Sequence, residues 1–217
     1  MSWRNGRPGM WRLLVSSVTA IGLMLVLLTP TLANAASAQV KKPDGALTAS
    51  WWQQIVGSTT LDRCDLGTGK IVFLAGTTGE PTPTRTCTTD KNKTFLVPLI
   101  NVECSTAEGD GDTFAELSEC AAGFADAFTD LKLVVDGLEV SNLNSLRVKA
   151  QSTFTSVDGN PFGIPVATNS KFAADGYWAL IKLTPGEHTL TFGGTFPVPP
   201  PDPSFTTLVT YNLLVKN

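Results

Sequence analysis

The sequence predicts an all-β protein: a single β-sandwich, immunoglobulin-like or jelly-roll, with a short helix in the loop between Cys104 and Cys120. Two general observations support this class. The chain contains 19 glycines and 14 prolines, so turn-forming residues are frequent. Beyond the N-terminal segment, short runs of β-branched and aromatic residues are common, whereas long helical periodicities are scarce.

A third observation is a pair of strand-like runs joined by a proline-glycine turn. Tyr177–Leu183 and His188–Phe192 flank this turn. Pro185 presets φ near −65° and Gly186 tolerates positive φ, as a type II turn requires. Such turns do not match the twist of a tight two-residue hairpin. We therefore expect a corner that carries the chain between two packed sheets, as in the E-to-F corner of immunoglobulin-like sandwiches.

Several further segments have the composition of strands. Pro98 removes one ladder donor, so its strand is expected to carry a bulge or to lie at an edge. Asp136-Gly137 predicts a hairpin turn. The expected strands are Lys70–Gly76, Thr94–Ile100, Leu131–Val135, Leu138–Val140, Leu146–Ala150, Thr153–Thr155 and Thr206–Val215, the last with Val209, Tyr211, Leu213 and Val215 on one face.

Two short helices are expected between the strands. Thr113 with Glu116 three residues later is a capping-box pattern, and it predicts a helix that begins there. Ser50 is expected to cap a second helix that contains Trp51 and Trp52. The preceding segment, Gln39–Ala49, is polar and is expected to be a loose leader.

Residues 1–38 have the features of an export signal that is removed. Basic residues precede the apolar run Leu13–Leu28, and small residues permit cleavage after Ala35 or Ala38. The alternative is an uncleaved membrane anchor, because the apolar run approaches the length of a span. The cleavage motifs favour removal. We expect a secreted, extracytoplasmic chain with no further membrane span, in which residues 39–217, roughly 180 in all, form one domain.

Charge and cysteine content narrow the functional classes. The formal net charge of −3 and the absence of a basic cluster argue against nucleic acid as a partner. The four cysteines, Cys64, Cys87, Cys104 and Cys120, predict two structural disulfides in an exported chain. Three pairings are possible, and sequential pairing is the simplest. The sequence does not favour a zinc site, because it has no CxxC motif and only one histidine to serve as a ligand.

The order of several motifs resembles a family of uncharacterised secreted bacterial β-sandwich proteins. The resemblance spans nearly the whole mature chain and implies a secreted β-sandwich. That family has no established activity, so it supplies no catalytic residues. The motifs are Trp51-Trp52, Val72–Thr77, Arg85–Cys87, Pro98–Asn101 with Glu103-Cys104, Val135–Gly137, Asp175–Trp178, and Leu183, Pro185, Gly186 and His188.

Candidate catalytic residues are few. Glu103 is expected just past the end of one strand and Asp175 at the start of another, so these carboxylates would form an acid pair for glycoside hydrolysis if they converge at one rim. Acidic residues at such positions more often form turns. His188 is the only imidazole available as a general base. Its place after the turn favours a structural role, in which a ring nitrogen bonds to nearby backbone.

Two features suggest a ligand. Trp51 and Trp52 form either a sugar-stacking platform or, as we favour, a buried plug at one end of the sandwich. The acidic segment with Glu108, Asp110, Asp112 and Glu119 resembles the spacing of a calcium loop. It departs from that pattern because Glu occupies the first position and Thr113 replaces the turn glycine. The alternative is a solvated loop held at its base by Cys104 and Cys120. Calcium is the one cofactor that the sequence suggests.

Together these features predict an exported binding or cell-surface structural module whose partner is an extracellular ligand or surface polymer. The alternative is a secreted hydrolase that acts on polysaccharide or another polymer. The module predicts exposed aromatic side chains on a sheet face or loop rim and no converging acid pair. The hydrolase requires a cleft that holds two carboxylates, or His188 beside a hydroxyl.

Overall fold

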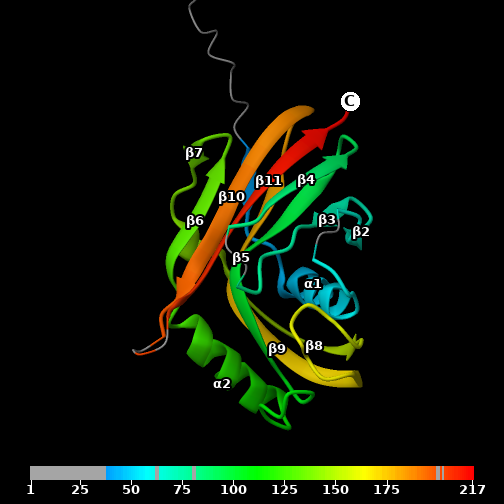
Figure 1. Cartoon of the computed structure of the whole chain (residues 1–217), viewed down its shortest axis with the longest axis vertical. Helices are drawn as coiled ribbons and strands as arrows, with labels where there is room; N and C mark the ends of the chain where they lie inside the picture. Colours follow the sequence, from blue (N-terminus) through cyan, green and yellow to red (C-terminus); the bar gives the residue numbers. More distant parts are fainter. Residues whose placement is uncertain (1–37, 62–63, 80–81, 199–200, 202) are drawn as a thin grey trace, which may run out of the picture. The chain divides into compact units, whose positions relative to one another are not determined.

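The computed structural model describes residues 38–217 except 62–63, 80–81, 199–200 and 202. The predicted signal segment therefore lies outside the described residues, apart from Ala38. The described chain is mostly β, as predicted, and its strands form two sheets (Figure 1). No helix in this part of the chain is long and apolar enough to cross a membrane.

The first sheet has six strands and is centred on two long ones, β5 and β9. Their antiparallel pairing runs from Thr94–Lys182 to Ser105–Phe172. β1 and β8 share the other edge of β9, because β1 pairs with its end and β8 with its beginning. The strands are β1 (Gln39–Lys41), β2 (Gly67–Thr68), β3 (Ile71–Phe73), β5 (Thr94–Ser105), β8 (Arg147–Ser156) and β9 (Ala167–Lys182).

The second sheet has five strands in the order β4-β11-β10-β6-β7. β10 and β11 form its centre and lie side by side over their whole length (Figure 1). Asp136-Gly137 joins β6 to β7, as predicted. The strands are β4 (Thr84–Thr89), β6 (Thr129–Val135), β7 (Leu138–Glu139), β10 (Gly186–Phe196) and β11 (Phe205–Val215).

An apolar core joins the two sheets. Strand β11 shows the alternation that builds it, since every second residue from Val209 to Val215 is buried and Asn212 and Leu214 are exposed. Phe95 and Ile181 contribute from the first sheet, and Phe192 from the second. The sheets are not closed into one another. The immunoglobulin-like or jelly-roll assignment therefore remains a prediction.

The predicted corner between the sheets is confirmed. β9 ends at Lys182 in the first sheet, and β10 begins at Gly186 in the second. Gly186 has φ +137°, a conformation that favours glycine. The predicted irregularity at Pro98 is also confirmed, because the β5–β9 register shifts between Pro98 and Ile100. Leu99 is the extra residue of this bulge.

Helix α1 (Gly45–Val56) packs on β8 (Figure 1). It helps to enclose a second apolar cluster with Phe73, Leu96 and Trp178. The prediction that Ser50 caps this helix was wrong. Asp44 is the N-cap, because its carboxylate accepts a 2.7 Å hydrogen bond from Leu47 N. The segment predicted to be a loose leader instead forms β1 and the first turn of α1.

Helix α2 (Phe114–Ala125) confirms the predicted helix after Cys104. Thr113 and Glu116 form the expected capping box, in which each side chain accepts from the backbone N–H of the other. Leu117 and Ala121 are buried against β5 and β9. The Cys104–Cys120 disulfide joins α2 to β5, and the second disulfide is Cys64–Cys87, so sequential pairing is confirmed.

Candidate functional site

A cavity of about 580 Å³ is lined by residues of α1, β5, β11 and the loops at 76–78 and 161–164. This volume lies within the usual range of small-molecule sites, roughly 300–1,000 Å³. The path of β5 determines where the cavity lies. Before its bulge at Leu99, β5 packs on the second sheet, and after the bulge it carries Asn101 and Glu103, which line the cavity.

Aromatic rings form one wall of the cavity. Trp51 packs edge-on against Trp52 at a centroid distance of 5.1 Å, and Trp52 lies 5.1 Å from Phe162. Phe205, which is 37% exposed, also lines the cavity. Trp51 and Trp52 are only 1% and 3% exposed. They are core side chains that also line the cavity, rather than an exposed platform.

The two tryptophans differ in their hydrogen bonding. The Trp51 indole N–H donates to Leu74 O at 2.7 Å. The Trp52 indole nitrogen is buried and has no hydrogen-bond partner within the described chain. A buried N–H without a partner is unfavourable by about 1–3 kcal/mol. A molecule inside the cavity that accepts this hydrogen bond would remove that penalty.

Glu103 is a buried carboxyl group on the cavity wall. It is 9% exposed, and its Oε2 has no hydrogen-bond partner among the described residues. Burial raises its pKa to about 10, with help from a hydrogen bond to Glu108 and from the charges of Glu108 and Asp110, against a lowering hydrogen bond from Ser105. Glu103 is therefore protonated at neutral pH, and its carboxyl group can both donate and accept.

The acidic segment after β5 holds Glu108 at the cavity. Asp110 Oδ2 accepts from Ser105 N at 2.9 Å, and Ser105 Oγ donates to Glu108 Oε2 at 3.3 Å. Both bonds fold the segment back onto the end of β5, beside the Cys104–Cys120 disulfide. The resulting turn places Glu108 beside Glu103.

The four calcium candidates are dispersed. Among the described residues, no three of Glu108, Asp110, Asp112 and Glu119 bring oxygens within 4.8 Å of one another. Asp110 lies close to the sulfur atoms of Cys104 and Cys120, but a disulfide does not supply thiolate ligands. The capping box also reaches into this segment, since Asp112 N donates to Glu116 Oε2 at 2.9 Å.

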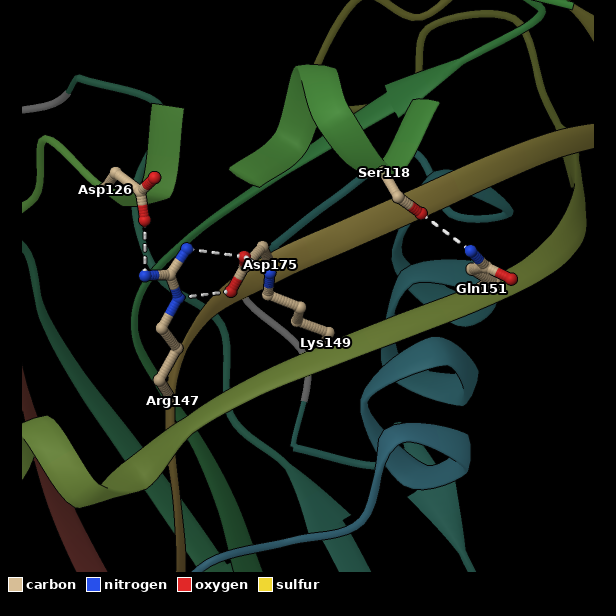
Figure 2. A network of polar contacts seen from close by, with 6 residues as sticks. All are labelled: Ser118, Asp126, Arg147, Lys149, Gln151 and Asp175. Carbon is tan, nitrogen blue, oxygen red and sulfur yellow. Dashed lines mark hydrogen bonds and ion pairs between the residues drawn. The ribbon is translucent and has the colours of Figure 1, made fainter. Parts of the chain in front are cut away.

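Asp175 belongs to a different part of the molecule. Its buried carboxylate accepts two hydrogen bonds from Arg147, at 2.8 Å from Nε and 2.7 Å from Nη2 (Figure 2). Arg147 also donates to Asp126 at the end of α2, and the bond to Asp175 is the main reason that the pKa of Arg147 is raised. The network joins β8, β9 and α2, which is a structural arrangement.

The same network extends along the edge of α2. Gln151 on β8 donates to Ser118 Oγ at 2.7 Å, and Lys149 Nζ lies 3.6 Å from Asp175 Oδ2 (Figure 2). The first of these contacts attaches α2 to β8, and the second joins β8 to β9. Asp175 therefore faces a helix and an arginine, and Glu103 faces the cavity.

His188 lies at the corner, in the second sheet. One ring nitrogen is 2.8 Å from Asp136 Oδ2, and the other is 2.8 Å from Thr184 O. Asp136 Oδ1 in turn accepts from Thr189 N. Both ring nitrogens are thus engaged by the turn and the neighbouring hairpin, in agreement with the structural role favoured by the sequence.

The sequence patterns indicate Glu103 and the tryptophan pair as candidate site residues, but not Phe162 or Phe205. Phe162 sits in a loop that the sequence marked only as irregular, and Phe205 follows a proline-rich segment. Neither carries a motif. Glu103 lies inside β5 rather than past a strand end, because the strand continues beyond its bulge to Ser105.

Comparison of the chain with protein-family models, with curated proteins and with solved structures finds no match.

Proposed function

We propose that this protein is an exported binding module that holds a small molecule in the cavity lined by Trp52 and Glu103. One observation carries the proposal: both residues present a buried polar atom without a protein partner, and both line the same cavity. A ligand that accepts from the Trp52 N–H and pairs with the Glu103 carboxyl group would offset the unfavourable burial of these two unpaired groups.

Export is part of the proposal. Two disulfides suit an oxidising compartment outside the cytoplasm. The N-terminal pattern and the resemblance to secreted bacterial proteins support the same location. The resemblance adds no activity, so the ligand is argued from the cavity alone.

The competing function is hydrolysis of a polysaccharide or another polymer, and Glu103 with Glu108 is the acid pair that favours it. Glycosidases separate their two carboxyl groups by roughly 5 Å or more, which leaves room for the bond to be cleaved. Here Glu108 lies beside Glu103, and the two carboxyl groups interact directly, as the raised pKa of Glu103 indicates. The pair suits the wall of a binding site better than a hydrolytic centre.

A cavity-blocking variant tests the proposal. Gly76 lines the cavity, adopts no glycine-specific backbone conformation, and has open space where a Cβ would be added. Gly76→Phe should fill the cavity without a backbone clash and abolish ligand-induced thermal stabilisation in a screen of metabolites. Gly123→Phe is the matched control, because Gly123 also has open space but lies on α2, away from this cavity.

The outcomes are distinct. Loss of all stabilising ligands in Gly76→Phe but not in Gly123→Phe supports the binding module. Ligands that stabilise the Gly76→Phe protein as well as the wild type contradict it. Turnover of a polymer that depends on Glu103 and Glu108 would instead establish the hydrolase.

A further inference from the structure

We infer that the cavity selects a neutral, polyhydroxylated molecule such as a sugar over organic anions and cations. This inference rests on the proposed function, because it names the ligand class of the same site. It is argued from the charges, the unpaired polar atoms and the rings that line the cavity.

Charge excludes anions. The ionisable side chains on the described lining of the cavity are Glu103 and Glu108, and no lysine, arginine or histidine is among the residues that line it. An anionic ligand would approach carboxyl groups without a cation to offset its charge, which is unfavourable in a partly desolvated site.

The two unpaired polar atoms disfavour cations. An ammonium group donates hydrogen bonds but accepts none, so it would leave the Trp52 N–H without a partner. It would also require Glu103 to lose its proton in order to form an ion pair, although burial favours the protonated acid. A cation therefore pairs only with Glu103, which must first lose its proton, and leaves the Trp52 N–H without a partner.

A hydroxyl group meets both requirements. Its oxygen accepts from an indole N–H, and its hydrogen donates to a carboxyl oxygen. Neighbouring hydroxyls of one sugar can serve Trp52 and Glu103 in this way, while the amide of Asn101 adds a third polar group on the wall. The apolar faces of a sugar ring find the rings of Phe162 and Phe205 on the same lining.

The probes are small molecules of three charge types. Glucose, galactose, N-acetylglucosamine and cellobiose are neutral, glucamine carries a primary ammonium group, and gluconate is anionic. Binding is measured by titration calorimetry at pH 7 on the mature protein. We expect at least one neutral sugar to bind at least tenfold more tightly than glucamine and gluconate.

Matched variants test the two polar atoms. Trp52→Phe keeps the aromatic ring but removes the N–H, and it should weaken sugar binding by about threefold to tenfold, the equivalent of one hydrogen bond. Trp178→Phe is the control, since the Trp178 indole nitrogen is likewise buried and unpaired but does not line the cavity. Trp178→Phe should leave the affinity unchanged.

The acid is tested separately, so that the inference remains falsifiable if Trp52→Phe fails to fold. Glu103→Gln retains a neutral group that donates and accepts, and it should preserve sugar binding within about threefold, whereas Glu103→Leu should weaken it by about tenfold or more. Gly76→Phe should abolish binding of whichever probe is held.

Tighter binding of glucamine that is lost in Glu103→Gln would overturn the inference, as would the absence of any neutral sugar that binds. In the first case Gly76→Phe would still block the ligand, and the proposed function would stand. If no probe or metabolite depends on Gly76, the proposed function itself fails.

Discussion

Glu103 and Asp175 lie one register position apart on the antiparallel strands β5 and β9, and their side chains point to opposite faces of the first sheet. Glu103 pairs with Ala174, which belongs to the cluster beneath α1, and Asp175 pairs with Val102, which packs toward α2. Facing residues of an antiparallel pair share a face, and successive residues alternate. The two carboxyl groups therefore serve different environments.

This separation predicts that Asp175 acts in stability. Asp175→Asn should lower the free energy of unfolding by about 3 kcal/mol, because it removes one partner of a buried ion pair with Arg147. Lys149→Ala is the control. The Lys149 side chain is 66% exposed and its ammonium lies 3.6 Å from Asp175 Oδ2, so this ion pair should contribute less than about 1 kcal/mol. Urea denaturation measures both. An Asp175→Asn protein that unfolds with the same free energy as the wild type but loses ligand binding would contradict this assignment.

Glu103 predicts a pH dependence of stability. Its pKa is raised from 4.5 to about 10 by burial and by Glu108. Between these values the folded protein retains a proton that the unfolded chain releases, so its contribution to stability is complete below pH 4.5 and declines as the pH rises toward 10. Glu103→Gln should remove this decline. The free energy of unfolding of the variant, measured relative to that of the wild type, should therefore increase from pH 5 to pH 9.

Glu116 is the control for that experiment, because its pKa is shifted in the opposite direction to that of Glu103. Hydrogen bonds from the backbone of Asp112 and from Thr113 lower the pKa of Glu116. Its stabilising contribution is present above the unfolded pKa and is lost as the pH falls. Glu116→Gln should therefore be destabilising at pH 7 and approach wild type at low pH. Identical pH profiles for wild type and Glu103→Gln would contradict the buried, protonated acid.

His188 is expected to stabilise the corner between the sheets. His188→Ala should lower the free energy of unfolding by about 1–3 kcal/mol, because Thr184 O and Asp136 each lose a hydrogen-bond partner. The exposed neighbour Glu187 provides the control, and Glu187→Ala should change stability by no more than about 0.5 kcal/mol. Unchanged stability together with lost activity would instead assign His188 to catalysis.

The two disulfides are expected to differ in their effect on binding. Replacing Cys104 and Cys120 with alanine should lower stability by about 3 kcal/mol, and replacing Cys64 and Cys87 should have a similar effect. Only the first pair flanks the turn that holds Glu108 at the cavity, so only its loss should weaken ligand binding. Equal binding by both variants, measured by calorimetry below their melting temperatures, would exclude this coupling.

Calcium should leave the melting temperature unchanged. A ligand stabilises a protein only if the native state binds it, and the oxygens of Glu108, Asp110, Asp112 and Glu119 are not gathered around one point. The measurement is a thermal melt in 2 mM calcium and in excess chelator. A chelator-reversible increase that disappears in Asp112→Asn would establish the calcium loop that the sequence spacing suggested.

The local features of the fold could be read from the sequence because they depend on neighbouring residues. The capping box at Thr113, the hairpin at Asp136-Gly137 and the corner at Gly186 each follow from the chemistry of two to four consecutive positions. Asp44 was missed as a cap because Ser50 is an equally good capping residue, and only the packing of α1 distinguishes the two.

The candidate site depended on long-range contacts. The sequence singled out Trp51, Trp52 and Glu103, but their relation depends on the bulge at Leu99 and on Phe162, from a loop, and Phe205, from the start of β11, each more than fifty residues away. The surroundings of the Glu103 and Asp175 carboxyl groups also depend on long-range contacts. A strand's alternation is local, but which face becomes a cavity and which meets an arginine is decided by what the tertiary fold places against it.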